Sequence, residues 1–166
     1  KCWIFTSGGG ATHGSINVMQ ALAQSCNYFF YEMGYRLGTN SKGNYDSALG
    51  LSKIEKYAKV LGLDMKSGVE ITERDPHFST ESAVHSAIGQ GSNAYTPVQL
   101  ARYVSTIANG GKNYSLTLLD KVVSSKGKTV LKKKSKLTNT VDASGSTWDA
   151  IHTGMREVIT EGTVYK

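Results

Sequence analysis

Apolar residues in the first forty positions repeat at helical spacing in two stretches, with a polar break between them. The first stretch predicts a helix from about residue 16 to 24, capped by Ser15, with an apolar stripe at Ile16, Met19, Leu22 and Ala23. The second ends at Gly38, and its stripe is Phe29, Phe30, Met33 and Leu37. Ser25-Cys26-Asn27 lies between them. Ser and Asn favour such breaks because their side chains compete for backbone hydrogen bonds.

The middle of the chain also predicts helices. Residues 39–50 are polar and glycine-containing, which indicates a loop, and Ser52 with Glu55 is a candidate capping box for a helix that ends at Gly62. Residues 63–80 are irregular, and residues 81–88 favour a short helix.

A strong helix start follows at Thr96-Pro97-Val98-Gln99, with Thr as N-cap, Pro at the first position and Gln three residues after the cap. Asn109-Gly110-Gly111 stops this helix. The two glycines of Ile88-Gly89-Gln90-Gly91 favour a tight turn before it, rather than a loop that shapes a cleft.

The last third of the chain predicts one small β element and a final helix. Strand-forming residues at Leu116–Val123 and Thr129–Leu131 flank a turn at Ser125-Lys126-Gly127, which indicates a hairpin over about residues 116–131. Ser146 with Asp149 caps a helix over about residues 146–160. The prediction is one mainly α domain with a small β-hairpin.

Composition narrows the class of protein. With 166 residues, 39% hydrophobic and 19% charged, the chain is globular, and it has no run of about 18 apolar residues that would span a membrane. The net charge of +6 owes much to Lys132, Lys133, Lys134 and Lys136. No aromatic stacking platform accompanies these lysines, so we expect a solvated loop and no nucleic-acid partner.

Neither cysteines nor histidines show metal-ligand spacing. Cys2 and Cys26 either pair or stay free, since sequence alone does not place their Cα atoms within about 7 Å. There is no CxxC and no HExxH, so we expect no zinc site. The four histidines are expected at the surface or in ordinary packing, at His13, His77, His85 and His152.

The candidate chemistry lies in the Ser-x-Asn pattern, which occurs at Ser15-Ile16-Asn17 and again at Ser25-Cys26-Asn27. A hydroxyl and a carboxamide two residues apart can shuttle a proton and hold a peptide, but either copy is equally well a helix cap. Spacing alone does not choose between these readings.

The residues around the two patterns favour a catalytic role for one of them. Three runs of residues carry a family resemblance: "SCNYFFYEMGYRLG", "SAIGQGSNAYTPVQLARYVSTIANGG" (Ser86–Gly111) and the closing "MREVITEGT" (Met155–Thr163). In this order they resemble the penicillin-binding transpeptidases of bacterial cell-wall synthesis, particularly the monofunctional class B type. The resemblance covers nearly the whole chain and selects Ser25-Cys26-Asn27 as the Ser-x-Asn motif. It implies the helical lobe of the α+β penicillin-binding transpeptidase (β-lactamase-like) fold.

The resemblance also implies a chemistry and its partners. In this family a serine activated by lysine attacks the D-Ala-D-Ala amide of a peptidoglycan stem peptide, and a second amine takes the acyl group. Ser25 would relay a proton, and Asn27 would be both a catalytic and a substrate-binding residue. Penicillins and other β-lactams would bind the full domain at the outer face of the cytoplasmic membrane, anchored by a segment outside this chain. No cofactor and no metal are implied.

The family's other two motifs are missing here. The only literal Ser-x-x-Lys, Ser125-Lys126-Gly127-Lys128, is downstream of Ser25 and in the predicted turn, and Lys128-Thr129-Val130 lacks the glycine of Lys-Thr-Gly. We therefore expect residues 1–166 to be an internal fragment of a transpeptidase domain, inactive alone, which works with the remaining parts of that domain. Its last helix would pack on the missing sheet.

Two alternatives stay open. A non-catalytic peptide-binding or scaffold module of the cell-wall machinery would lack Ser-x-x-Lys in its full-length chain as well. A β-lactamase fragment fits less well, because the Thr-Pro-x-Gln-x-Ala context is transpeptidase-like.

Overall fold

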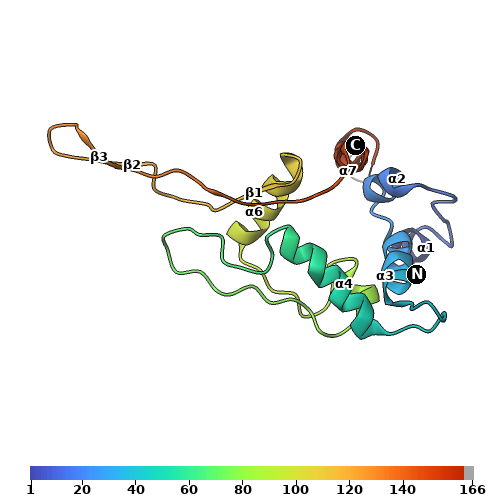
Figure 1. Cartoon of the computed structure of the whole chain (residues 1–166). Coiled ribbons are helices and arrows are strands. Elements are labelled where there is room, and N and C mark those ends of the chain that lie inside the picture. The colour runs from blue at the N-terminus through green and yellow to red at the C-terminus, as the bar shows by residue number, and fades with distance from the viewer. Residues whose placement is uncertain (163–166) are drawn as a thin grey trace. The chain divides into compact units, whose positions relative to one another are not determined.

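The computed structural model describes residues 1–162 (Figure 1). These residues form two compact units, and the chain passes between them at four points, the first of which lies within a helix. Unit 1 comprises Lys1–Glu55, Ser79–Asn93 and the described residues from Ala143 onward, and unit 2 comprises Lys56–Phe78 and Ala94–Asp142. The end of the predicted Met155–Thr163 match lies outside the described residues.

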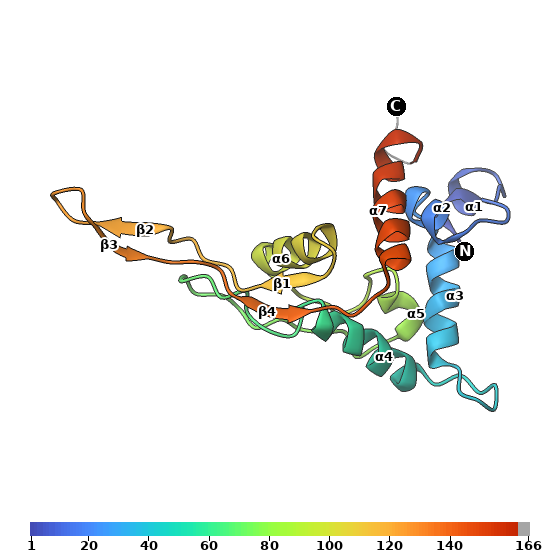
Figure 2. The same cartoon turned by 45° about the horizontal axis from the view of Figure 1, so that its top comes forward.

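Unit 1 is helical. Its elements are α1 (Trp3–Ser7), α2 (Val18–Ala23), α3 (Asn27–Gly38), the first part of α4 (Ser47–Val60), α5 (Ala83–Ser86) and α7 (Gly145–Thr160). Figure 2 shows α7 beside α2, a pairing that depends on a close approach at Gly154. A Cβ on Gly154 would lie 3.0 Å from the Cα of Met19 and 2.9 Å from Cδ1 of Leu22.

A second close contact joins α3 to α5. A Cβ on Gly34 would lie 2.7 Å from the carbonyl oxygen of Ala83 and 2.9 Å from the Cα of Val84. Since both atoms belong to the backbone of α5, they cannot move aside as a side chain would. A helical glycine is therefore tolerated at Gly34 despite its low helix propensity.

Three predicted helix starts are wrong by a few residues, because another side chain caps each helix. Asn17, not Ser15, caps α2, since its side chain accepts from the Gln20 amide and the Gln20 side chain accepts from the Asn17 amide. Ser144, not Ser146, caps α7. The predicted capping box at Ser52 lies inside α4, which begins at Ser47 after the Asp46 carboxylate accepts from the Ala48 amide at 2.8 Å.

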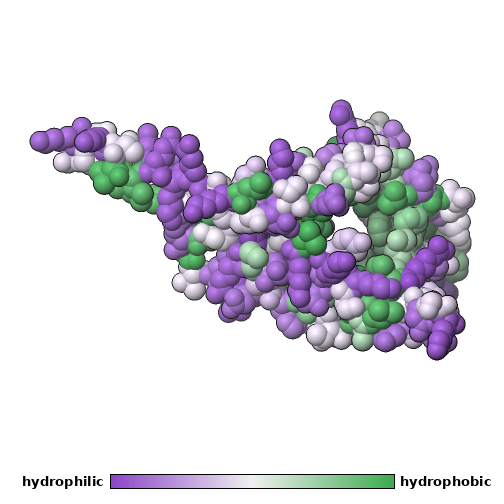
Figure 3. Space-filling view, viewed as in Figure 1, coloured by the Kyte–Doolittle hydropathy of each residue, from purple (hydrophilic) through white to green (hydrophobic). Residues whose placement is uncertain are grey.

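Unit 2 contains α6 (Pro97–Ala108) and four short strands. The predicted capping box of α6 is confirmed, with reciprocal bonds between Thr96 and Gln99. Strands β2 (Lys121–Val123) and β3 (Thr129–Lys132) form the predicted hairpin. Figure 3 shows this hairpin as largely hydrophilic with a hydrophobic patch. The exposed apolar residues of the hairpin include Val122 and Val130.

The remaining strand pair was not predicted. β1 (Lys112–Tyr114) pairs antiparallel with β4 (Leu137–Thr140), and a register shift follows Asn113. These strands are three and four residues long and are far apart in sequence, so neither carries a recognisable period-2 pattern.

A buried arginine organises unit 2. The Arg102 guanidinium, 2% exposed, donates to the carbonyl oxygens of Lys66 at 2.9 Å and Met65 at 2.8 Å, and also to that of Gly62. Burial lowers the pKa of Arg102, and the carboxylates of Glu73 and Asp64 oppose this shift. One side chain thereby holds the irregular segment after α4 against α6.

The architecture is mainly helical with a small β portion, as predicted. Among the described residues, no helix has both the length and the apolar character needed to cross a membrane. On α7 the apolar face is only partly covered, since Ile159 is 67% exposed and Met155 is 38% exposed. Docking of this face on a sheet remains a prediction.

Candidate functional site

Ser25-Cys26-Asn27 forms the junction between α2 and α3, as predicted. The Cys26 amide donates to the carbonyl of Ala21 at 2.9 Å, and the Ser25 amide donates to that of Leu22 at 3.1 Å. This pair of bonds is a Schellman motif, in which the residue after the helix cap adopts left-handed geometry and is usually glycine. Ser25 occupies that position.

Ser25 therefore has an unusual backbone. Its φ is +49°, and it is the only non-glycine residue with positive φ among the described residues. A side chain in this region costs on the order of 1–3 kcal/mol and persists where the surroundings or the function require it. Glycine would fit the turn better, so the Ser25 side chain stands against the local backbone preference.

The two outer side chains of the motif keep their polar groups free of hydrogen bonds among the described residues. Ser25 is exposed and Asn27 is half-buried at the first position of α3. Within the described part of the chain, neither the Ser25 hydroxyl nor the Asn27 carboxamide forms a hydrogen bond. The other copy of the pattern differs, because Asn17 is committed to capping α2.

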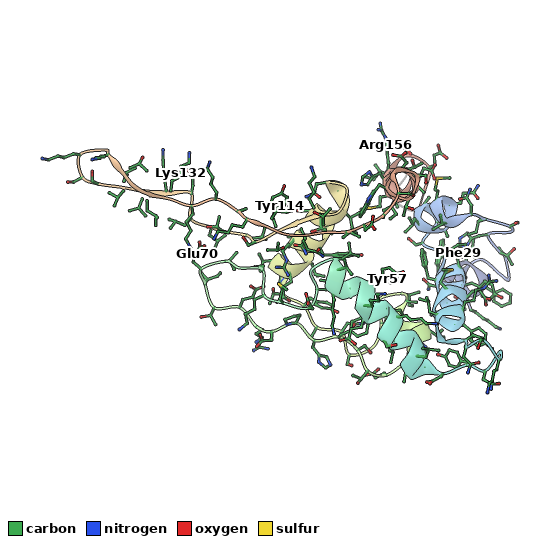
Figure 4. All side chains as sticks on the ribbon, viewed as in Figure 1. Phe29, Tyr57, Glu70, Tyr114, Lys132 and Arg156 are labelled. Atoms are coloured by element: carbon green, nitrogen blue, oxygen red, sulfur yellow. The ribbon has the colours of Figure 1, made fainter. Side chains whose placement is uncertain are left out.

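Cys26 points the other way, into the core of unit 1. It is 4% exposed and packs in one cluster with Cys2 and Ala21, against which Phe29 also lies (Figure 4 labels Phe29 on α3). Both cysteines are free thiols. The motif thus presents Ser25 outward and anchors itself through Cys26.

His13 contacts the Cys2 thiol at this anchor and lies within 4.8 Å of the Cys26 thiol. The Nδ1 atom of His13 lies 3.6 Å from Sγ of Cys2, and Sγ of Cys2 lies 3.8 Å from Sγ of Cys26. The other ring nitrogen of His13, Nε2, is buried and has no hydrogen-bond partner among the described residues. Sequence reasoning assigned His13 to the surface or to ordinary packing, and no spacing signal could have paired positions 2, 13 and 26.

The two thiols have different acidities. Burial raises the pKa of the Cys26 thiol, and the neighbouring Cys2 raises it further. For Cys2 burial also acts to raise the pKa, but it is outweighed by the backbone amides of Tyr28 and Ile4 and by the Cys26 thiol, so the pKa of Cys2 is lowered. Tyr28 is in the first turn of α3, where unpaired amides stabilise negative charge.

A cavity of about 610 Å³ lies beside this cluster in unit 1. Its wall includes Cys2, His13 and Cys26 together with the face of α3 that carries Phe29 and Met33. Ser25 and Asn27 do not line this cavity, so it is a separate feature from the outward-facing pair.

The other motifs lie where the sequence predicted. Gly89 and Gly91 have φ of +77° and +95°, as a tight turn requires. The literal Ser-x-x-Lys that starts at Ser125 lies in the turn between β2 and β3, where the Gly127 amide donates to the Ser124 carbonyl at 2.9 Å. It does not start a helix.

A solved structure and two sequence relatives identify the class of fold and of protein. Penicillin-binding protein 2B of Streptococcus pneumoniae superposes on 97% of this chain and 28% of its own, with a TM-score of 0.77 and 25% sequence identity. Penicillin-binding protein 2A of Bacillus subtilis is 31% identical over 167 residues, which cover 90% of this chain and 23% of that protein. The peptidoglycan D,D-transpeptidase PbpA of Mycolicibacterium smegmatis is 32% identical over 111 residues, covering 62% of this chain and 20% of that protein.

The family follows from a broader match. The sequence model of the penicillin-binding protein transpeptidase domain matches residues 5–166. The chain belongs to the family of penicillin-binding protein transpeptidase domains, as the sequence resemblance predicted. It spans about a quarter of the length of the relatives it matches.

Proposed function

We propose that this chain supplies the Ser-x-Asn motif to a peptidoglycan DD-transpeptidase that crosslinks stem peptides through a serine acyl-enzyme. The family match over residues 5–166 carries the proposal. It is supported by the strained, exposed position of Ser25, whose hydroxyl has no structural hydrogen bond among the described residues.

The two outer residues of the motif divide the work. Ser25 transfers a proton to or from the departing amine as part of a general acid–base relay. Asn27 donates its amide to the backbone of the stem peptide ending in D-Ala-D-Ala and fixes it for attack. A β-lactam, which acylates the same serine nucleophile, contacts the same two residues.

The rest of the machinery belongs to the whole protein. No Ser-x-x-Lys precedes Ser25 in these 166 residues, so the nucleophile and its lysine come from elsewhere in the transpeptidase. The whole protein works at the outer face of the cytoplasmic membrane, held by an anchor outside this chain. The isolated 166-residue chain is inactive.

Labelling with a fluorescent penicillin tests the proposal. The whole encoded protein is compared with its Ser25→Ala and Asn27→Ala variants, and the acylation rate is read from the labelled band. Removing a proton relay slows such steps by about 10²–10⁴-fold, so we expect losses of this size for Ser25→Ala. Asn27→Ala is expected to weaken penicillin binding as well as the acylation rate.

Ser15→Ala is the matched control, because Ser15 occupies the same place in the other Ser-x-Asn pattern. The Ser15→Ala protein should take the label at the normal rate. A Ser25→Ala protein that labels as fast as the unaltered one would remove the proposed role. A whole protein that takes no label would favour the non-catalytic peptide-binding module. Covalent label on the isolated chain would show that its nucleophile lies within the 166 residues.

A further inference from the structure

The cluster of Cys2, His13 and Cys26 has the composition of a transition-metal site. Two thiolates and an imidazole are the donors that zinc prefers in proteins. The three residues come from separate places: the segment before α1, the loop before α2, and the junction between α2 and α3. All three ligand atoms lie within 4.8 Å of one another.

Two of the three distances between these atoms match tetrahedral zinc, and the third, between Cys26 and His13, is no longer than 4.8 Å. With Zn–S of about 2.3 Å and Zn–N of about 2.05 Å, a tetrahedral site separates two sulfurs by about 3.8 Å and a sulfur from a nitrogen by about 3.6 Å. The observed Sγ–Sγ distance between Cys2 and Cys26 is 3.8 Å, and the distance from Sγ of Cys2 to Nδ1 of His13 is 3.6 Å. A disulfide has sulfurs about 2.05 Å apart and would leave the histidine without a role.

The surroundings also suit a metal. Cys2 and Cys26 are 8% and 4% exposed, so both thiols are shielded from solvent. The cluster forms part of the wall of the 610 Å³ cavity, which leaves room for a fourth ligand such as water. Three protein ligands with one further position match zinc sites that keep an exchangeable ligand, whereas closed structural sites usually have four protein ligands.

We propose that Cys2, His13 and Cys26 bind one Zn²⁺ ion, which fastens the Ser-x-Asn motif to the N-terminal segment. Cys26 lies between Ser25 and Asn27, so a bond to its sulfur restrains the backbone that positions both. The metal is a structural clamp on the motif and takes no part in acyl transfer. The inference concerns residues of this chain alone and stands apart from the proposed catalytic role of Ser25.

Metal binding is measured directly on the reduced 166-residue chain. After loading with Zn²⁺ and desalting, elemental analysis should give one zinc per chain, and competition with a chromophoric chelator gives the affinity. Co²⁺ in place of zinc should show the thiolate-to-cobalt charge-transfer band and the intense visible bands of a tetrahedral site. Bound zinc should also slow alkylation of both thiols.

Variants separate this site from adventitious binding. Cys2→Ser, His13→Gln and Cys26→Ser should each lower zinc affinity by more than about 100-fold, since changes outside the ligand shell already cost 10–100-fold. His77→Ala is the matched control, because His77 is exposed in unit 2 and bonds to Ala94 through its backbone. Circular dichroism confirms that each variant is folded.

Three results would overturn the proposal: no zinc retained by the reduced chain, equal affinity in the ligand variants and the control, or a Cys2–Cys26 disulfide that forms equally fast with and without zinc. Thiol protection in the unaltered chain needs no variant, so the proposal stays testable if a substitution prevents folding.

Discussion

Replacing Ser25 with glycine should stabilise the fold while impairing the proposed function. At φ of +49° the Ser25 backbone is in the region that glycine adopts without penalty. A left-handed side-chain-bearing residue costs about 1–2 kcal/mol, and glycine loses about 0.5–1 kcal/mol more backbone freedom on folding. The difference favours Ser25→Gly by about 0.5–1 kcal/mol. At about 2–4 °C per kcal/mol for a chain of this size, the midpoint should rise by about 1–4 °C.

Tryptophan fluorescence during thermal unfolding is the suitable assay. Trp3 and Trp148 both belong to unit 1, as Ser25 does, and Nε1 of Trp3 donates to the Gln24 carbonyl at 3.2 Å, one residue before the strained position. The signal therefore reports on the unit in which the substitution is made.

Two further variants decide whether backbone strain is the cause. Ser25→Ala keeps the Cβ and removes the hydroxyl, so its stability should stay within about 0.5 kcal/mol of the unaltered chain. Ser15→Gly is the matched control, because Ser15 lacks positive φ and glycine there should lower stability. A Ser25→Gly chain that melts lower, or a Ser25→Ala chain that gains as much, would refute the reasoning. In the whole protein both Ser25 variants should lose acylation.

Three other predictions rest on separate contacts. Arg102→Met should destabilise unit 2 by about 3–5 kcal/mol, because three carbonyl oxygens lose a buried donor. The control Arg36→Met removes an exposed ion pair with a neighbouring glutamate and should cost less than about 0.5 kcal/mol. Urea unfolding followed by circular dichroism compares the two variants. Gly34→Ala should cost about 1–3 kcal/mol through its clash with α5, but Gly145→Ala, with open space at its Cβ, should be neutral or stabilising in the same assay. Hydrogen bonds from the Thr117 hydroxyl, the Lys133 ammonium and the Leu118 amide lower the pKa of Glu70 from 4.5 to about 2. The stabilising contribution of Glu70 is therefore complete above its ordinary pKa of 4.5 and is lost as the pH falls through about 2. An NMR titration of Glu70 should show this low pKa, and Glu70→Gln should abolish this part of the pH dependence of stability. Equal losses in either variant pair, or a Glu70 titration near 4.5, would contradict these expectations.

Elements with local signals were predictable from the sequence. The Thr96 cap, Pro97 and Gln99 define the start of α6 within four consecutive residues, and Gly38 ends α3 where expected. Where two polar residues compete for one cap, sequence cannot rank them, because the choice depends on the direction from which the chain enters the helix. Asn17 rather than Ser15 is such a case.

The sequence by itself determined the family, the helical character and the place of Ser25 and Asn27, since those depend on residue order and local capping. Only the structure showed Ser25 in the glycine position of a Schellman motif, because, although the bonds back into α2 that set its φ are local, serine is not the residue that signals this conformation. It alone brought His13 to Cys2 and Cys26, since the packing of three distant segments, and not their spacing along the chain, creates that cluster.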